Sequence, residues 1–537
     1  MKPSLSLSLS LSIVALLASG RAHATTITSQ SCTVQADNSM RFDCTINLSN
    51  SDTVRVGRRP QTGGPWKWSL WRTGDPVTIV LYNFDPDVDY EYKWEISSGG
   101  GTGAINLTGG PDLPTDLDDL DLDVTRNTGA LTNYVMFDTM DCTGTLEYLV
   151  AVDTTGGHVA WYQDIEAAAS LADARITGWS WTADNTLLTI VNRSYLYEWA
   201  LDGSETATPI DLSPTCSKGA GDQGECPHHD AFRSDDNGKT YVATGTMDLS
   251  LLPSDTTDFD YYPCNTLDGF VDDGVRVYAS GFGSSADHSL MVDMGFAPDV
   301  DGGPNPVCPA DSTYWEEFGF DASYDVIDWT HVNSTTAIDI GGNERVRLSL
   351  REWDQIVNYD PDTRTVDWVL NGTDPARSDF ALAMDAGVSG HPDFGGQHHV
   401  THVPGGLLMF DNREHADAGT TARAIQIDLD LMGWDATIVK SWALRETGSQ
   451  DPIDCTFLGS AVLVPGSGGE HVLANCGPET LIQELGESDG ELTVDPLLEI
   501  SLDRSSAGGW DYCDGGGGPA TRGHFYRAWP LAQLGEF

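Results

Sequence analysis

Three short histidine-bearing segments and one arginine-bearing segment hold the side chains that could do chemistry in this 537-residue sequence. The segments are Pro227–Asp230 (PHHD), Asp328–Ser334 (DWTHVNS), Gln397–His402 (QHHVTH) and Leu348–Glu352 (LSLRE). Six of the 13 histidines lie in the first three: His228, His229, His331, His398, His399 and His402. Neutral imidazoles can attack electrophiles or move protons near neutral pH, and the guanidinium of Arg351 offers anionic oxygens a permanently charged fork. Together they predict a site built from neutral imidazoles and one permanent cation.

Repeated strand–turn–strand units indicate how segments so far apart in the sequence could meet. Leu149–Tyr162, Ile356–Val369 and Ala424–Trp442 share one plan: a strand ending in Asp, a turn, and a Val near a Trp. One such unit cannot bury both of its faces without neighbours, which is typical of a β-propeller. Asp360 and Asp428 are 68 residues apart, and about 400 residues shared by six blades give roughly that spacing. We therefore predict an all-β fold with a six-bladed β-propeller over residues 131–537, whose inner strands bring the histidines and Arg351 to the axis.

The first part of the mature chain has a different pattern. Ser31–Leu48 alternates like a hairpin, and Val77–Ile96 reads as a strand, a turn and a second strand with a Tyr-x-Tyr-x-Trp face. This pattern resembles a fibronectin type III domain, so a small β-sandwich is expected over residues 25–110. The acidic stretch that follows predicts a linker over residues 111–130.

The N-terminus and the cysteines point to export. Residues 1–24 read as a signal peptide, with an apolar stretch and the small-residue cleavage motif Ala22-His23-Ala24. No later run reaches the ~18 apolar residues that a membrane helix needs. All ten cysteines lie in the mature chain, so disulfides are expected in an oxidising compartment, the periplasm or the exterior. The nearest pairs are Cys32–Cys44, Cys216–Cys226, Cys264–Cys308 and Cys455–Cys476, with Cys142–Cys513 left as a closing link.

The net charge of −53 argues against some classes of partner. With 81 acidic residues against 28 basic ones, the protein would repel nucleic-acid backbones and anionic membranes. We therefore expect neither a nucleic acid nor a membrane as partner, while a homo-oligomer stays open.

The order of the chemical segments resembles that of the bacterial arylsulfotransferases, also called aryl sulfate sulfotransferases, from about Thr132 to Pro530. The resemblance rests on HHD, on DWTHVNS followed by LSLRE, and on QHHVTHVPGGLLMFDN at 397–412. Phe457–Ala461 and Tyr526-Arg527-Ala528 add to it. The family implies a six-bladed propeller with a small N-terminal β domain in an exported enzyme. It also implies transfer of a sulfuryl group from a phenolic sulfate ester to a phenol, with no nucleotide donor, metal or other cofactor.

The resemblance also assigns catalytic roles. The nucleophile, which follows Gln in the third segment, falls on His398, although His399 directly after it leaves an alternative. The other two catalytic histidines fall on His331 and His229, with His228 as the alternative to His229.

Arg351 completes the site that the resemblance implies, and it would contact the substrate together with His228 and His331. Sulfuryl transfer resembles phosphoryl transfer, an in-line displacement helped chiefly by positioning and by cationic hydrogen-bond donors. Arg351 would hold the sulfuryl oxygens, His398 would form an N-sulfo intermediate, and His331 or His229 would move the phenol proton. Two half-reactions through one site predict ping-pong kinetics.

Two other functions are compatible with the same residues. His398, His399 and His402, with His228 or His229, could hold a metal ion, but neighbours in a strand point to opposite faces, so His398 and His399 could not both bind it. The chain could also be a secreted β-propeller binding protein, although such a protein has no need of three histidine segments and Arg351. A His398→Ala change separates the cases, because binding would survive it and transfer would not.

Overall fold

The computed structural model describes residues 25–532 with gaps in between. The gaps are residues 36–37, 83, 87, 100–104, 107–111, 119–121, 142–146, 172–173, 175, 193, 205, 207–208, 212–225, 234–239, 246–269, 272–273, 280–283, 287–325, 328–331, 341, 361–362, 364, 414–420, 449–450, 454, 456–457, 487–494, 503–522 and 525. The signal peptide expected at 1–24 lies outside the described residues. Strands dominate the described chain, which confirms the all-β prediction. The named helices are short: α1 Thr115–Asp118, α2 Ile165–Ala169, η3 Arg351–Trp353 and η4 Pro375–Arg377.

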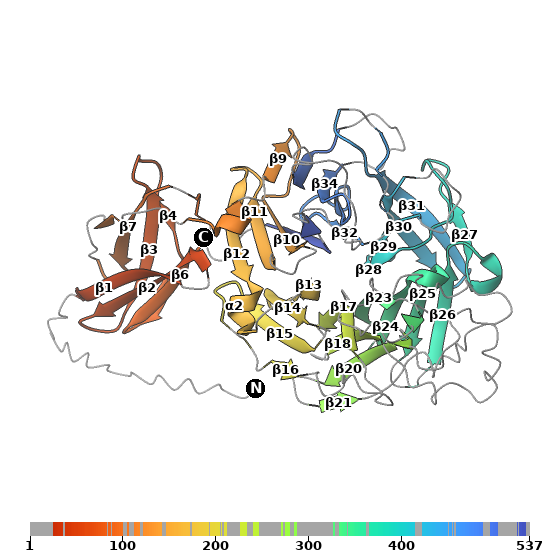
Figure 1. Ribbon diagram of the computed structural model, residues 1–537, viewed down its shortest axis with the longest axis horizontal. Helices are drawn as coiled ribbons and strands as arrows, with labels where there is room; N and C mark the ends of the chain where they lie inside the picture. Colours follow the sequence, from red (N-terminus) through yellow and green to blue (C-terminus); the bar gives the residue numbers. More distant parts are fainter. Residues whose placement is uncertain are drawn as a thin grey trace, which may run out of the picture.

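Residues 27–106 form two antiparallel sheets that pack against each other (Figure 1, at the left). One sheet has the order β1-β2-β6 and the other β4-β3-β7-β8, with β5 also paired to β3. The bounds are β1 Ile27–Gln35, β2 Asn38–Leu48, β3 Asp52–Pro60, β4 Lys67–Trp68, β5 Arg72–Gly74, β6 Val77–Leu81, β7 Tyr90–Ile96 and β8 Ile105–Asn106. Between the sheets, the ring of Phe42 lies 4.7 Å from that of Phe84 and 6.5 Å from that of Tyr92. The pairing of β1 with β2 confirms the expected hairpin, while the likeness to fibronectin type III stays a prediction.

The rest of the described chain consists of sheets whose strands mostly follow one another in sequence. Their orders are β12-β11-β10-β36 with β37 also on β10, β16-β15-β14-β13-β17-β18-β20-β21, β23-β24-β25-β26, β27-β31-β30-β29-β28 and β32-β33-β34-β35-β9, besides the short pair β19-β22. The bounds are β9 Leu122–Arg126, β10 Tyr134–Asp141, β11 Tyr148–Asp153, β12 His158–Asp164, β13 Ile176–Trp181, β14 Thr186–Val191, β15 Tyr195–Ala200, β16 Ile210–Asp211, β17 Cys226–Arg233, β18 Thr240–Gly245, β19 Phe270–Val271, β20 Gly274–Ala279, β21 Ser284–Ala286, β22 Val326–Ile327, β23 Val332–Asp339, β24 Glu344–Leu350, β25 Gln355–Asp360, β26 Thr365–Asn371, β27 Ala381–Met384, β28 His398–Val403, β29 Gly406–Asp411, β30 Arg423–Asp430, β31 Asp435–Ala443, β32 Ser460–Leu463, β33 Val472–Cys476, β34 Leu481–Leu485, β35 Leu498–Leu502, β36 Gly523–His524 and β37 Ala528–Leu531.

These sheets surround a common centre, with β13, β17, β23, β28 and β32 near it (Figure 1), whereas β10 lies between β11 and β37 in its sheet. Inner strands of neighbouring sheets contact one another: β13 meets β17 at the Gly178–His229 bridge, and β23 contacts both β17 and β28. The ring closes where β37, near the C-terminus, pairs with β10. The arrangement is propeller-like, and it brings the inner ends of strands that are distant in sequence side by side.

The structure differs from the expected acidic linker at residues 111–130. β9 lies in this segment and pairs antiparallel with β35. It is therefore the last strand of the sheet β32-β33-β34-β35-β9. Leu122 and Val124 of β9 pack against the hydrophobic core. Their alternation with Asp123 and Thr125 is a strand pattern inside an acidic run, and the core contact decides in favour of the strand.

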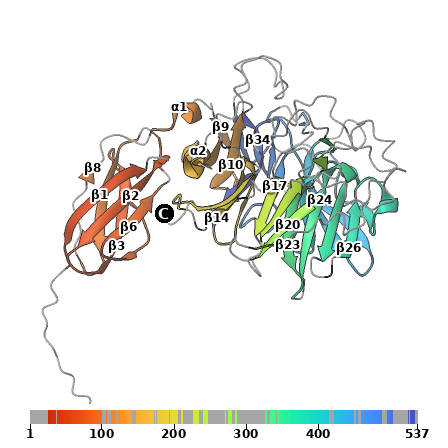
Figure 2. The ribbon, with the colours of Figure 1, turned by 60° about the horizontal axis from the view of Figure 1, so that its bottom comes forward.

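The two N-terminal sheets are joined to the ring through β2 and β12. The backbone nitrogen of Ser39 donates to the hydroxyl of Tyr162 at 2.7 Å, and Asn38 Nδ2 donates to the Tyr162 carbonyl oxygen. Arg41 Nη1 donates to Gln163 Oε1 at 3.3 Å. These contacts join β2 to β12, and Figure 2 shows the N-terminal sheets beside the ring.

One ion pair across this junction makes it sensitive to pH. His158 Nε2 of β12 lies 2.8 Å from Asp85 Oδ1 of the N-terminal part. Burial opposes protonation of His158, but Asp85 outweighs it, so the pKa of His158 is raised, and His158 in turn lowers the pKa of Asp85. The His158 contribution to stability is therefore complete below the unfolded-state pKa near ~6.5 and is lost as pH rises through the raised folded-state value. The Asp85 contribution is lost at the acidic end, as pH falls through its lowered pKa.

The His158→Gln variant should therefore lower Tm at about pH 6 and leave it unchanged at about pH 9, where the imidazole is neutral in both states. The expected decrease is small because Asp85 is half-exposed and the pair is screened. Thermal unfolding of both proteins at the two pH values measures it. The same Tm difference at both pH values would contradict the prediction.

Two of the expected disulfides lie in the described chain. Cys32–Cys44 joins β1 to β2, and Cys455–Cys476 joins the segment before β32 to β33. The predicted pairs Cys216–Cys226, Cys264–Cys308 and Cys142–Cys513 lie outside the described residues or have no described side chain. Disulfides agree with an exported protein. Among the described residues, no helix is both long and apolar enough to span a membrane.

Candidate active site

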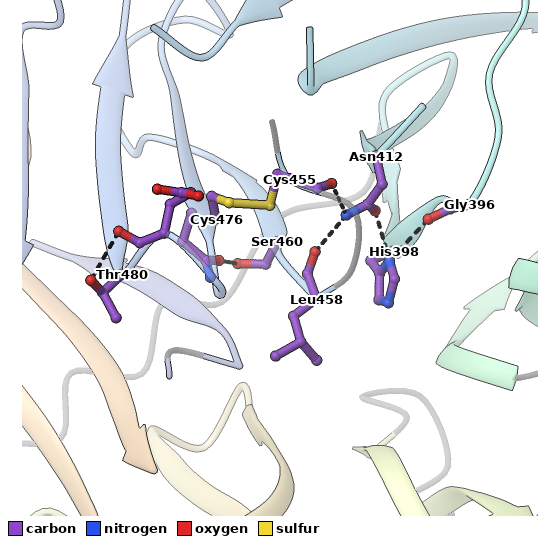
Figure 3. Close-up of a disulfide and its surroundings, with 10 residues drawn as sticks. Gly396, His398, Asn412, Cys455, Leu458, Ser460, Cys476 and Thr480 are labelled. Atoms are coloured by element: carbon purple, nitrogen blue, oxygen red, sulfur yellow. Dashed lines mark hydrogen bonds between the residues drawn. A yellow bond between two sulfur atoms is a disulfide. The ribbon is translucent and has the colours of Figure 1, made fainter. Parts of the chain in front are cut away.

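His398 begins β28 and is almost completely buried, with 2% of its surface exposed. Its Nδ1 atom lies 2.7 Å from Asn412 Oδ1 and 3.0 Å from the carbonyl oxygen of Gly396 (Figure 3). Both partners accept hydrogen bonds, so in the neutral ring the proton sits on Nδ1 and Nε2 carries the lone pair. In Figure 3 the other ring nitrogen points away from both acceptors. His398 is thus held as the tautomer that can use Nε2 as a nucleophile.

Asn412 follows β29 and is oriented by the segment that leads into the next sheet. Its Nδ2 donates to the carbonyl oxygens of Cys455 and Leu458, both at 2.8 Å (Figure 3). Because carbonyl oxygens only accept, the amide nitrogen must face them and the amide oxygen must face His398. The disulfide between Cys455 and Cys476 ties this segment to β33.

Arg351 lies at the start of the short helix η3, directly after β24, and not on a strand as the sequence suggested. The tight connection between β24 and β25 forces a turn here, which ends at Asp354 with a left-handed φ of 51°. The Asp354 N–H donates to the Arg351 carbonyl at 3.2 Å. Asp354 Oδ1 accepts from Gly396 N at 2.8 Å. The turn that carries Arg351 is therefore bonded to the backbone two residues before His398.

Gln397 strengthens the same connection from a fully buried position. Its Nε2 lies within 3.1–3.2 Å of the Ser349 hydroxyl and the carbonyl oxygens of Leu350 and Gln355. Its own carbonyl accepts from Asn333 Nδ2 of β23 at 2.7 Å. Gln397 thus joins β28 to β23, β24 and β25, and this fixes the Arg351 turn relative to His398.

His399 has a left-handed φ of 50° at a register shift between β28 and β29. This bulge interrupts the strand alternation, and both His398 and His399 are buried. His399 Nδ1 lies 3.1 Å from the Ala461 carbonyl oxygen in the neighbouring sheet. Burial and the nearby charge of Arg527 hold the pKa of His399 well below its usual range. His399 is thus a neutral ring that faces a different neighbour from His398.

His402, at the other end of β28, faces a third partner. Its Nδ1 lies 2.9 Å from Arg347 Nη1, and because arginine only donates, this nitrogen accepts. The opposite-face argument against a metal ion does not hold at the bulge. The rings of His398, His399 and His402 nevertheless have different Nδ1 partners, and the described residues contain no group of three or more ligating side chains suited to a metal ion.

His229 lies in β17, also at a left-handed φ of 55° and at a register shift. Its backbone approaches Gly178 of β13 so closely that a Cβ there would lie 2.4 Å from the His229 carbonyl oxygen. Its ring is centred 5.9 Å from that of Tyr526. The hydroxyl of Tyr526 lies 3.4 Å from the Asn333 carbonyl oxygen, so a chain of contacts runs from His229 to Gln397 and His398.

Asp230, the last residue of the HHD motif, is in a buried ion pair. Its Oδ1 lies 2.7 Å from Arg527 Nη1, and its Oδ2 accepts from Thr335 N at 2.8 Å. Arg527 Nη1 also donates to the Trp179 carbonyl at 2.7 Å, and its backbone nitrogen donates to Asp138 Oδ1 at 2.9 Å. Burial alone would lower the pKa of Arg527, but Asp230 and the other anionic neighbours raise it. The C-terminal segment is thus bonded to β10, β13 and β17.

Two predicted site residues cannot be placed in this way. His331 lies outside the described residues, and only the backbone of His228, in β17, is described. The structure brings together His398, the Arg351 turn and, through intermediate contacts, His229.

The supporting residues Asp230, Asp354, Gln397 and Asn412 received no role from the sequence alone. Each is a buried polar side chain beside an apolar strand segment, as in LLMFDN. Such groups are hydrogen-bonded in native proteins, so buried polar residues within or next to strands were a usable signal. Their side-chain partners lie 14 to 297 residues away in the sequence, from His398 for Asn412 to Arg527 for Asp230, and no spacing rule predicts them.

The fold and site define a class: an all-β, propeller-like protein with a buried histidine close to a hydrogen-bonded, arginine-bearing turn. Residues 312–496 match the family model described as Arylsulfotransferase (ASST). This segment, which contains Arg351 and His398, is therefore similar to the arylsulfotransferase family, and the match supports the resemblance seen in the sequence. The match supports an arylsulfotransferase activity in general terms. No curated protein matches the chain.

Three solved structures show a distant resemblance to the chain. A protein from Lactobacillus plantarum has 13% identity and a TM-score of 0.35, covering 69% of this chain and 82% of that one. The allergen Mala s 1 of Malassezia sympodialis has 11% identity and a TM-score of 0.33, covering 73% and 94%. BamB of Moraxella catarrhalis has 9% identity and a TM-score of 0.25, covering 76% and 85%. At these TM-scores the likeness carries no argument about function.

Proposed function

We propose that the chain is an aryl sulfate sulfotransferase that moves a sulfuryl group from a phenolic sulfate ester to a phenol, without a nucleotide donor and by a ping-pong mechanism. The observation that carries the proposal is His398, a buried imidazole whose Nδ1 faces two acceptors and whose Nε2 is left with the lone pair. Two further observations support the assignment. His398 lies in the segment that matches the family model, and the Arg351 turn is bonded to Gly396, two residues before His398.

In the first half-reaction, the Nε2 lone pair of His398 attacks the sulfur of the donor. The Nε2–S bond forms, the S–O bond to the aryl group breaks, and the electron pair leaves with the phenolate oxygen. His331 or His229 gives this oxygen a proton, with His228 as the alternative to His229. Arg351 binds the equatorial sulfuryl oxygens, where negative charge is held in the transition state.

In the second half-reaction, the acceptor phenol attacks the sulfur of sulfo-His398. The new S–O bond forms, the Nε2–S bond breaks, and the phenol proton returns to the same histidine base. The enzyme is then restored, with its proton still on Nδ1. One nucleophile shared by both halves is the physical reason for ping-pong kinetics.

The proposal extends to the architecture and the location of the protein. The sheet orders support six four-stranded blades if the eight-stranded sheet is divided at the parallel contact between β13 and β17. In this division β9 and β37 close the ring, a β-sandwich of residues 25–110 precedes it, and residues 1–24 direct export. The disulfides support a periplasmic or extracellular location.

The test is an assay with 4-nitrophenyl sulfate as donor, with and without added phenol, and without nucleotide or metal. We expect release of 4-nitrophenolate that depends on the phenol, with formation of phenyl sulfate. Parallel lines in double-reciprocal plots at several phenol concentrations would support the ping-pong order. Release without an acceptor would indicate a hydrolase, and no release from several aryl sulfates would overturn the proposal.

A further inference from the structure

We infer that Asn412 is a positioning residue that keeps the proton of His398 on Nδ1 throughout the reaction. The sulfuryl group is therefore transferred to and from Nε2. The inference rests on the proposed function, because it takes His398 as the nucleophile. Its tests include one that does not depend on activity.

The orientation of the Asn412 amide leaves it a single way to bind the imidazole. The two carbonyl oxygens of Cys455 and Leu458 take its N–H groups, so only its oxygen is directed at His398. Rotating the amide by 180° would place Oδ1 against those two carbonyl oxygens. The two carbonyl oxygens and Oδ1 itself would then have no hydrogen-bond donor. Asn412 is buried, with 3% of its surface exposed, so losing these hydrogen bonds would cost free energy that water does not restore. Asn412 is thus a fixed acceptor for a proton on Nδ1.

The same fixed acceptor matters more once the sulfuryl group is on Nε2. With Nδ1 protonated, the sulfonated ring is a cation, and breaking the Nε2–S bond returns a neutral imidazole. Without that proton, the leaving group would be an imidazolide anion, which is far more basic and leaves slowly. The oxygens of Asn412 and Gly396 stabilise the cation through the Nδ1–H bond, whereas the neutral amide has no basicity with which to remove its proton.

A carboxylate at this position would act differently. It would stabilise the protonated free ring and raise the pKa of His398, which removes the Nε2 lone pair at neutral pH. Among the described residues, the charged or titratable groups near this place include His399 on β28, Asp354 at the Gly396 N–H, and Asp411 and Arg413, which flank Asn412. Asp411 is paired with Arg423 at 2.9 Å and also lies near Arg413, so its charge is already balanced.

The experiment compares Asn412→Asp and Asn412→Leu with wild type in the sulfotransfer assay across pH. For Asn412→Asp, we expect the acidic limb of kcat/KM to move to higher pH by about 1–3 units. For Asn412→Leu, which fills the space without an acceptor, we expect kcat to fall by up to about 100-fold. Asn475→Asp is the matched control, because Asn475 is fully buried and accepts from Ser460, away from His398. Its pH profile should coincide with that of wild type.

Nitrogen NMR of histidine-labelled protein reads the position of the proton directly, with His398→Gln identifying the resonance. We expect Nδ1–H at His398 in wild type and a mixture of tautomers in Asn412→Leu. An unmoved pH profile in Asn412→Asp, or an unchanged tautomer in Asn412→Leu, would overturn the inference while leaving sulfotransfer intact. If the wild-type protein transfers no sulfuryl group, the proposed function is overturned instead. The NMR comparison would still decide whether Asn412 positions the imidazole of His398.

Discussion

Alanine at position 398 should reduce sulfuryl transfer by at least about 10⁴-fold, because both half-reactions pass through the imidazole that it removes. The other two described rings of β28 are bonded to different partners. The His399 Nδ1 faces the Ala461 carbonyl, and His402 faces Arg347. The rate of 4-nitrophenolate release in the presence of phenol measures the loss. In wild type treated with donor alone and quenched with base, the peptide that contains His398 should gain the mass of one sulfuryl group, and in the variant it should not.

The control for this variant is His402→Ala, a change on the same strand at a partly exposed ring. We expect its activity to stay within about threefold of wild type, since the exposed His402 is bonded to Arg347 and not to the residues around His398. Full activity in His398→Ala would refute the assignment of the nucleophile. Sulfuryl label on His399 in wild type would transfer the assignment to that residue.

Removing the Asp230 carboxylate should have the largest effect on stability. The Asp230→Ala variant leaves Arg527, whose side chain is 3% exposed, as a buried charge without its partner. Breaking a buried pair in this way costs about 3–5 kcal/mol of the free energy of unfolding. The loss includes the hydrogen bond from Thr335 N. Urea denaturation, analysed with its slope as a check of two-state behaviour, measures the change.

Two comparisons separate the ion pair from a general effect of substitution. Asp230→Ala combined with Arg527→Met should recover a large part of the loss, because an apolar pair needs no charge compensation. Asp435→Ala, at an exposed carboxylate of β31, should change the free energy of unfolding by no more than about 0.5 kcal/mol. A loss below about 1 kcal/mol in Asp230→Ala would show that the pair does not hold the inner strands together.

Local pattern was enough to predict much of the fold. The alternation of β2 and the repeated strand–turn–strand units come from a period of two, which any half-buried strand must show. The same reasoning failed at β9, where acidic residues hid a strand of only five residues. Its place is decided by pairing with β35, more than 370 residues away in the sequence, and pairing at that distance leaves no local signal.

The site shows the same division between local and distant information. The residue types of His398 and Arg351 define the available chemistry, a nucleophilic nitrogen and a permanent cation, and both are visible in the sequence. The turn that carries Arg351 was expected as a strand, because the apolar alternation of β24 gives no sign of where the helix η3 begins.

By itself, the sequence determined which groups could react, that strands would carry them, and which family their order resembles. The tertiary structure alone decided which imidazole nitrogen holds the proton, how the Arg351 turn is bonded to His398, and that Asp230 is paired with Arg527. The reason is physical. A buried polar atom must find a partner wherever the folded chain supplies one, and here those partners come from neighbouring sheets that no sequence spacing brings together.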